Sequence, residues 1–199
     1  MSEIRSTDDN LRIWWEAVLG GDTLAYSHVH ELLHPVLYRY AFAMLNDEAL
    51  ANDVVQELFI KIWFKKERIG MLQNVRAFWL TALRRQTLNQ LRSLRRLQIL
   101  PPSEPDIEFS TEDIIITAEQ QQDLKAKIAR YLNELPKRQK EIIYLYYYEE
   151  LSYDEIAGVM DINYQSVLNL MQKALKQLRE LVSHLPLLGP VWLAAKIFF

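Results

Sequence analysis

The stretch that decides the fold is Leu151-Ser-Tyr-Asp-Glu-Ile-Ala-Gly-Val-Met-Asp-Ile-Asn-Tyr-Gln-Ser-Val-Leu-Asn-Leu170. Ser152 and Glu155 form a capping-box pattern, which predicts that a helix begins at Tyr153. Asp161 follows that helix at a position where a left-handed backbone is often needed, and aspartate tolerates this conformation better than most residues. Asn163 can then cap a second helix. The pattern predicts two short helices joined by a tight turn.

Apolar residues in this stretch fall where the two helices must meet. Ile156 and Met160 supply the buried face of the first helix, and Ala157 is small where the second helix crosses closely. Val167 packs back from the second helix, together with Leu170 or Met171. This is the pattern of a DNA-binding helix-turn-helix. The alternative at this point is an ordinary helical hairpin inside a bundle.

The rest of the chain is also predicted to be helical, so the expected fold class is all-α. Only five glycines occur in 199 residues, and apolar residues recur at helical spacing with no sustained strand-like alternation. Helices are predicted over 8–19, 23–45, 48–66, 75–97, 118–135, 138–148, 153–160 and 165–182. Three prolines in 101–105 mark a break. We therefore expect a first domain over 8–97, an acidic linker over 98–117, a second domain over 118–183 and an apolar tail over 184–199.

Charge is segregated along the chain although the net charge is only −3. The segment 61–96 is strongly basic, with Glu67 as its single acid, whereas 101–123 holds seven acids and no Lys or Arg. A local basic field of this kind is typical of nucleic-acid binding. The chain has no cysteine, which excludes disulfides and thiolate metal sites. Its first residues do not resemble a signal peptide, so we expect a cytoplasmic protein.

Motifs in both halves point to one family. The run Asp53-Val-Val-Gln-Glu-Leu-Phe-Ile-Lys-Ile-Trp63 resembles the core-binding helix of bacterial RNA polymerase sigma factors. The segments Leu135-Pro-Lys-Arg-Gln-Lys-Glu141 and Leu151-Ser-Tyr-Asp-Glu-Ile-Ala157 are similar to the opening of that family's fourth region. With only two regions and a short linker, the chain resembles the small extracytoplasmic-function (ECF) subgroup of the sigma-70 family.

The resemblance implies binding to core RNA polymerase, at the clamp helices of its largest subunit and at its flap. On the helix around Asp53, the residues Gln56 and Glu57 lie about one turn away and form an acidic, hydrogen-bonding ridge. Such a ridge suits a basic partner helix, while a solvated polar face is the alternative. The predicted core-polymerase-binding residues are Asp53, Gln56, Glu57, Phe59 and Trp63.

The predicted helix over 75–97 resembles the region that melts and captures the promoter minus-ten element. Arginines on this helix can contact phosphates, and captured bases need polar and stacking partners. Gln86 stands where the family often has Asn, and Asn89 where it often has Asp, so individual base contacts stay open. A solvated basic face is the alternative. The predicted minus-ten residues are Arg84, Arg85, Asn89, Arg92, Arg95 and Arg96.

The second helix of the helix-turn-helix is predicted to read the minus-thirty-five element. Family members often carry Lys or Arg near the places of Leu168 and Leu170, so readout here must rest on neutral groups. Amides can pair with adenine, and lysines can contact phosphates. The predicted residues are Tyr164, Gln165, Ser166, Asn169, Lys173 and Lys176.

Two further signals compete with this interpretation. His30-Glu31-Leu-Leu-His34 matches the zinc-protease pattern formally, but no third ligand stands out, so a zinc hydrolase is only an alternative. The apolar tail is nearly long enough to span a membrane, but His184, Pro186, Pro190 and Lys196 interrupt it, so any membrane contact is expected to be indirect.

The expected protein is therefore a sigma factor without catalytic residues, metal or cofactor. It binds core polymerase and promoter DNA, and the resemblance adds an anti-sigma factor as its regulator. The acidic linker would thread through the RNA channel of the polymerase if it behaves as the family's does. A stand-alone helix-turn-helix regulator is the other alternative, but it gives no reason for the Asp53 to Trp63 motif.

Overall fold

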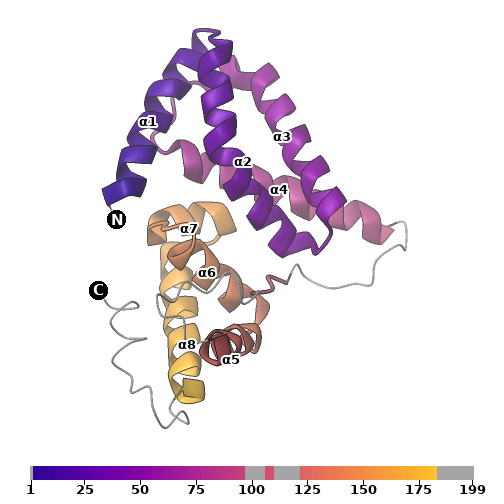
Figure 1. Cartoon of the computed structure of the whole chain (residues 1–199), viewed down its shortest axis with the longest axis vertical. Helices are drawn as coiled ribbons and strands as arrows, with labels where there is room; N and C mark the ends of the chain where they lie inside the picture. The colour runs from indigo at the N-terminus through magenta and orange to yellow at the C-terminus, as the bar shows by residue number, and fades with distance from the viewer. Residues whose placement is uncertain (1, 97–105, 110–121, 183–199) are drawn as a thin grey trace. The chain divides into compact units, whose positions relative to one another are not determined.

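The structure is a computed structural model that describes residues 2–96, 106–109 and 122–182. The described residues form eight helices and no strand, which confirms the predicted all-α fold (Figure 1). The chain divides into two compact units, 1–105 with 154–162, and 106–153 with 163–199. The helices are α1 (Ser2–Leu19), α2 (Thr23–Leu45), α3 (Glu48–Ile69), α4 (Val75–Arg96), α5 (Gln122–Asn133), α6 (Lys137–Tyr147), α7 (Tyr153–Met160) and α8 (Tyr164–Val182).

Helix α2 is the centre of the first unit and packs against α1, α3 and α4 (Figure 1). Its buried side chains include Val29, Leu37 and Tyr40, spaced as one helical face requires. Trp15 of α1 and Trp79 of α4 are fully buried beside this face and meet edge to face, with ring centroids 6.4 Å apart. Large aromatic side chains therefore join α1 and α4 through the core.

Capping side chains explain where two of these helices begin and end. The carboxylate of Asp22 accepts hydrogen bonds from the backbone N–H groups of Leu24 and Ala25 at the start of α2. Asp47 does the same for Leu50 in α3. Between the two helices, Asn46 takes the left-handed conformation at φ 51°, and its N–H bonds to Phe42 O. This side-chain chemistry satisfies amides that the first helical turn leaves without partners.

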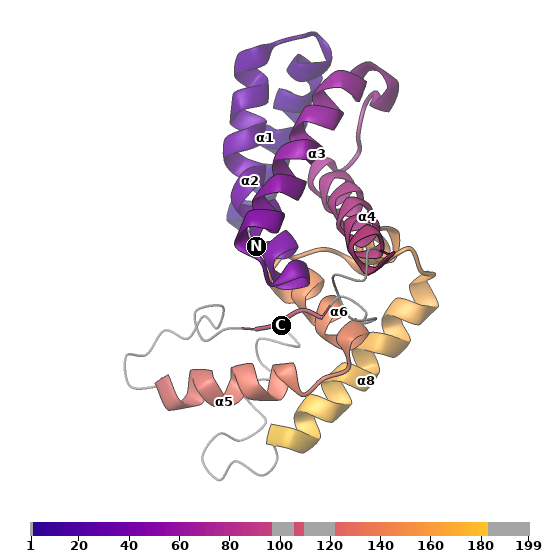
Figure 2. The same ribbon diagram turned by 90° about the vertical axis from the view of Figure 1, so that its right-hand side faces the viewer.

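In the second unit, α6 packs against α8, and the views in Figures 1 and 2 agree on this arrangement. The α6 side chains Ile142 and Leu145 are fully buried, as are Val167 and Ala174 of α8. The four α8 positions that face inward, Val167, Met171, Ala174 and Leu178, recur at three-to-four spacing. The opposite face of α8 is thereby left to solvent.

The turn between α7 and α8 has the predicted geometry. Asp161 adopts the left-handed conformation at φ 55°. Asn163 caps α8, since its Oδ1 accepts the Ser166 N–H at 2.7 Å. Ile156 and Met160 of α7 are buried. The helix-turn-helix pattern of the sequence therefore corresponds to two helices joined by the expected turn. The first has the predicted bounds, and the second begins at Tyr164, one residue before the predicted start.

Most of the predicted acidic linker and the whole apolar tail over 184–199 lie outside the described residues. Of the linker, 106–109 is described, and it lies within the second unit with Ile107 and Phe109 buried. Among the helices that the structure describes, none combines the length and the apolarity that crossing a membrane requires.

Candidate protein and nucleic-acid interfaces

The acidic ridge predicted on α3 is exposed. Asp53, Gln56 and Glu57 all lie on the solvent side of the helix, within one turn of each other. The buried side chains of α3, among them Val55 and Leu58, occupy the opposite face. The three polar residues are thus available to a partner without any change in the fold.

Phe59 needs a correction. It was predicted to bind the polymerase, but only 5% of its surface is exposed, and its ring lies 4.6 Å from that of Trp79 in the core. Phe59 therefore packs α3 against the core and offers no surface for direct contact. Trp63 is half-buried, with its ring 4.8 Å from that of Tyr26 and the Lys66 ammonium 3.7 Å above it.

Two exposed apolar residues complete the ridge, and the sequence interpretation missed both. Ile60 is 58% exposed and Phe64 is 81% exposed. They lie seven and eleven positions after Asp53, so helical geometry puts them on the same face as Asp53 and Glu57. That spacing was the available signal. We call Asp53, Gln56, Glu57, Ile60 and Phe64 the α3 ridge.

Helix α4 is tied to the α3 ridge by a side-chain amide. Gln86 Nε2 donates to Val54 O at 3.0 Å and to Glu57 Oε2 at 2.9 Å. The other carboxylate oxygen of Glu57 pairs with Lys61 Nζ at 2.8 Å. Gln86, which departs from the family pattern, therefore holds two helices together instead of facing solvent. Both oxygens of Glu57 already have partners within the chain.

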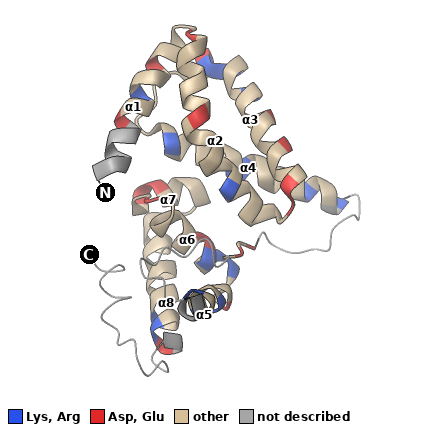
Figure 3. Ribbon diagram, in the orientation of Figure 1, with Lys and Arg blue, Asp and Glu red and all other residues tan. Residues whose placement is uncertain are grey.

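A basic stripe runs along the exposed face of α4. Arg85, Asn89, Arg92 and Arg96 follow one another at helical spacing and are all exposed. Figure 3 draws the basic residues of this helix in blue. Arg92 donates to Asn89 Oδ1 at 3.1 Å, which orients both side chains on the surface. We call these four residues the α4 stripe.

The other two predicted minus-ten residues do not belong to the stripe. Arg84 is half-buried one position away from it, and the side chain of Arg95 lies outside the described residues. The inward face of α4 carries Leu83, Thr87 and Leu91. The structure thus brings together a subset of the predicted arginines on one face, where phosphates can reach them.

The solvent face of α8 carries most of the predicted minus-thirty-five residues. Tyr164, Gln165 and Asn169 are exposed, and Gln165 Nε2 donates to Asn169 Oδ1 at 3.2 Å. Lys173 and Lys176 are exposed further along the same helix, while Ser166 is half-buried. The N-terminal half of α8 therefore presents neutral amides, and the next two turns present ammonium groups.

The two histidines of the zinc-protease pattern lie in contact with each other and with an aromatic ring of α3. The rings of His30 and His34 lie 5.0 Å apart, and the His30 ring lies 4.4 Å from Phe59. Burial, and then the neighbouring His34, lower the pKa of His30, and Glu31 opposes this shift. No group of three candidate metal ligands occurs within the described part of the chain. No geometry here favours a zinc hydrolase.

Comparison with known proteins gives two family matches. Residues 29–97 match the model of sigma-70 region 2, and residues 125–178 match that of sigma-70 region 4. The first range contains the α3 ridge and the α4 stripe, and the second contains the helix-turn-helix.

Individual relatives agree with these matches. The chain is 30% identical to the ECF RNA polymerase sigma factor SigL of Mycobacterium tuberculosis over 147 residues, which cover 72% of this chain and 81% of the relative. It is 24% identical to SigM of Bacillus subtilis over 158 residues, 78% of this chain and 95% of the relative.

A solved structure shares the fold as well. The sigma factor RpoE of Bartonella quintana, solved with the anti-sigma factor NepR, superposes with a TM-score of 0.57 at 25% identity. The match covers 80% of this chain and 97% of RpoE. The chain therefore belongs to the sigma-70 family of bacterial RNA polymerase sigma factors, within its extracytoplasmic-function subgroup.

Proposed function

We propose that this chain binds core RNA polymerase through the α3 ridge, engages the promoter minus-ten element through the α4 stripe, and reads the minus-thirty-five element with α8. The observation that carries the proposal is the α3 ridge, an exposed row of acids and large apolar side chains within the region-2 match. No step of this role needs a catalytic residue.

The chemistry of the α3 ridge fits a basic helix of the polymerase clamp. Phe64 is almost entirely exposed, and an aromatic side chain of this kind is a typical energetic anchor at a protein interface. Asp53 is exposed on the solvent side of α3, so its carboxylate can pair with a partner's cation. The acids then set orientation and specificity around the apolar anchor.

The α4 stripe is expected to act mainly on phosphates. We predict that Arg92→Ala combined with Arg96→Ala weakens promoter binding by the holoenzyme similarly on all cognate promoters. The negative slope of log K against log salt decreases in magnitude by about 1 to 2. The measurement is a salt titration of holoenzyme binding to labelled promoter DNA. Arg12→Ala with Arg39→Ala removes two other exposed arginines and serves as the control. An unchanged slope contradicts the proposed phosphate contacts.

The α8 amides are expected to carry sequence information. Since one good amide-to-base pair contributes about 1–3 kcal/mol, we predict that Gln165→Ala with Asn169→Ala lowers discrimination between cognate and scrambled minus-thirty-five elements about tenfold or more. Core affinity stays unchanged. Gln172→Ala, two turns further from the N-terminal end of α8, is the matched control. An unaltered promoter profile in a run-off transcription assay excludes this role.

The proposal includes regulation of this chain by an anti-sigma factor. RpoE of Bartonella quintana was solved in complex with one, and CnrH, which shares the fold at a TM-score of 0.57, was solved with the cytosolic domain of CnrY. We propose that this chain has such a regulator too. Its identity can be tested by copurification from the source organism.

The decisive experiment combines pull-down of purified core polymerase with run-off transcription from a library of genomic fragments. Core binding together with new, promoter-specific transcripts is the expected result. Specific DNA binding without core binding contradicts the proposal and favours a stand-alone helix-turn-helix regulator.

A further inference from the structure

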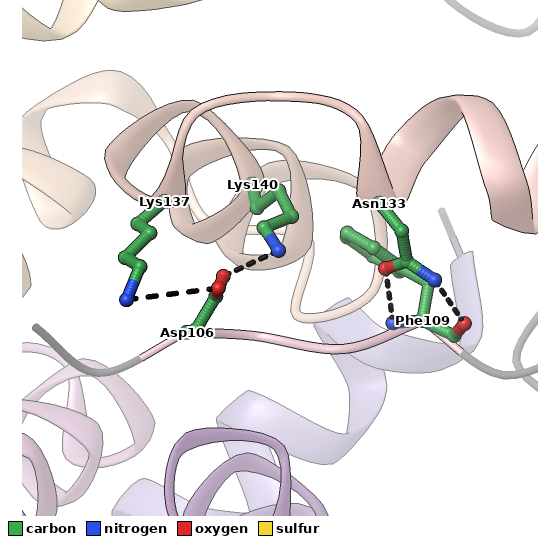
Figure 4. Close-up of polar contacts among 5 residues, drawn as sticks. All are labelled: Asp106, Phe109, Asn133, Lys137 and Lys140. Atoms are coloured by element: carbon green, nitrogen blue, oxygen red, sulfur yellow. Dashed lines mark hydrogen bonds and ion pairs between the residues drawn. The ribbon is translucent and has the colours of Figure 1, made fainter. Parts of the chain in front are cut away.

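A short extended segment, Asp106–Phe109, is docked on α5 and α6 of the second unit (Figure 4). The Asp106 carboxylate forms an ion pair with Lys140 and a second one with Lys137 at 3.7 Å. Only 7% of the Lys140 side chain is exposed. A buried ammonium group is costly without a counter-charge, and the Asp106 carboxylate supplies that counter-charge to Lys140 of α6.

The backbone of Phe109 is held by one side chain. Its N–H donates to Asn133 Oδ1 at 2.9 Å, and its C=O accepts from Asn133 Nδ2 at 2.9 Å. Asn133 is the last residue of α5. A single amide thus satisfies both polar backbone groups of a buried residue, as a neighbouring strand would.

The side chains of the segment alternate between the domain and solvent. Ile107 and Phe109 are buried, whereas Asp106 and Glu108 are exposed. The Phe109 ring lies 5.6 Å from that of Tyr148 and 6.3 Å from that of Tyr144. An ion pair, a backbone pairing and an aromatic contact therefore act on four consecutive residues, which is the recognition chemistry of a fitted peptide.

We propose that Asp106–Phe109 and its cradle of Asn133, Lys137 and Lys140 form a latch, closed in the free protein and opened when the chain assembles with core polymerase. The inference rests on the proposed function. The resemblance implies that the linker threads through the RNA channel of the polymerase, and a chain on that path would have to leave the cradle that holds these four residues. Part of the free energy of core binding is therefore needed to open the latch, and the observed affinity is lower by that amount.

The first test follows the latch directly. The chain has no cysteine, so Glu108→Cys and Lys127→Cys create the only two labelling sites, both at exposed positions. Spin labels on the full chain report a short distance in the free protein, and addition of core polymerase lengthens it. A short distance that persists in a formed holoenzyme overturns the latch but leaves the proposed function standing. Failure of the unlabelled chain to bind core overturns the proposed function instead.

The second test weakens the latch. Asn133→Ala removes both backbone hydrogen bonds, and Phe109→Ala removes the aromatic contact. Each is expected to raise core affinity about tenfold, because the closed state no longer competes. Glu108→Ala, which removes an exposed acid in the same segment, is the control. Circular dichroism checks that the helices persist, and if Phe109→Ala does not fold, Asn133→Ala alone decides. Unchanged or lower core affinity of a folded variant overturns the latch.

Discussion

Reversing the charge of Asp53 and Glu57 with Asp53→Lys and Glu57→Lys is expected to lower the affinity for core polymerase at least about a hundredfold. Both carboxylates are exposed on the α3 ridge, so two lysines there repel a basic partner helix, and such like-charge contacts cost several kcal/mol. Fluorescence anisotropy with labelled core measures the affinity. Circular dichroism checks that the helix persists, because Glu57→Lys also removes the hydrogen bond with Gln86 and the ion pair with Lys61.

The matched control makes the same charge change elsewhere. Glu16→Lys on α1 with Glu48→Lys at the start of α3 replaces two exposed acids outside the ridge, and core affinity is expected to persist. Ile60→Ser with Phe64→Ser tests the apolar half of the ridge, where a loss of about a hundredfold is also expected. If the control weakens binding as much as the ridge variant, the effect comes from net charge and the ridge is not the interface.

Truncating Trp79 with Trp79→Ala is expected to lower the free energy of unfolding of the first unit by about 3–5 kcal/mol. The side chain is fully buried, and its ring contacts those of Trp15, Tyr26 and Phe59, which come from three other helices. The resulting cavity lies where α1, α2, α3 and α4 meet. Urea denaturation followed by circular dichroism gives the change.

Trp14→Ala provides the comparison within the same unit. Trp14 is half-buried, and its ring stacks on His28 at 5.0 Å, so its truncation leaves no comparable cavity. We expect a loss of about 1 kcal/mol, the usual size for a partly exposed site. Equal losses for the two variants contradict the assignment of Trp79 to the centre of the core.

The sequence predicted the helices and the helix-turn-helix because their determinants are local. A left-handed turn residue such as Asp161, and a cap such as Asn163, act within one or two turns of their own position. The ends of α2 at Thr23 and Leu45 also match the prediction, and the structure shows that Asp22 and Asn46 cap them.

Features that depend on contacts between distant segments were not predictable in this way. The family motif placed Phe59 among the predicted polymerase-binding residues, but the packing of α3 on α4 buries its side chain in the core. The same packing leaves Ile60 and Phe64 exposed. The docking of Phe109 on Asn133 joins residues 24 positions apart, in a segment whose prolines and acids indicated only a linker.

The Gln86 side chain gives the first unit a property that neither interface has alone. It bonds to the α3 backbone and to Glu57, so the helix with the basic stripe and the helix with the acidic ridge share a hydrogen bond. A polymerase cation that draws the Glu57 carboxylate away also removes a partner of Gln86 on α4. Any effect that the proposed core contact has on the α4 stripe through this hydrogen bond is reciprocal: whatever core polymerase adds to the affinity for the minus-ten element, that DNA must add equally to the affinity for core polymerase.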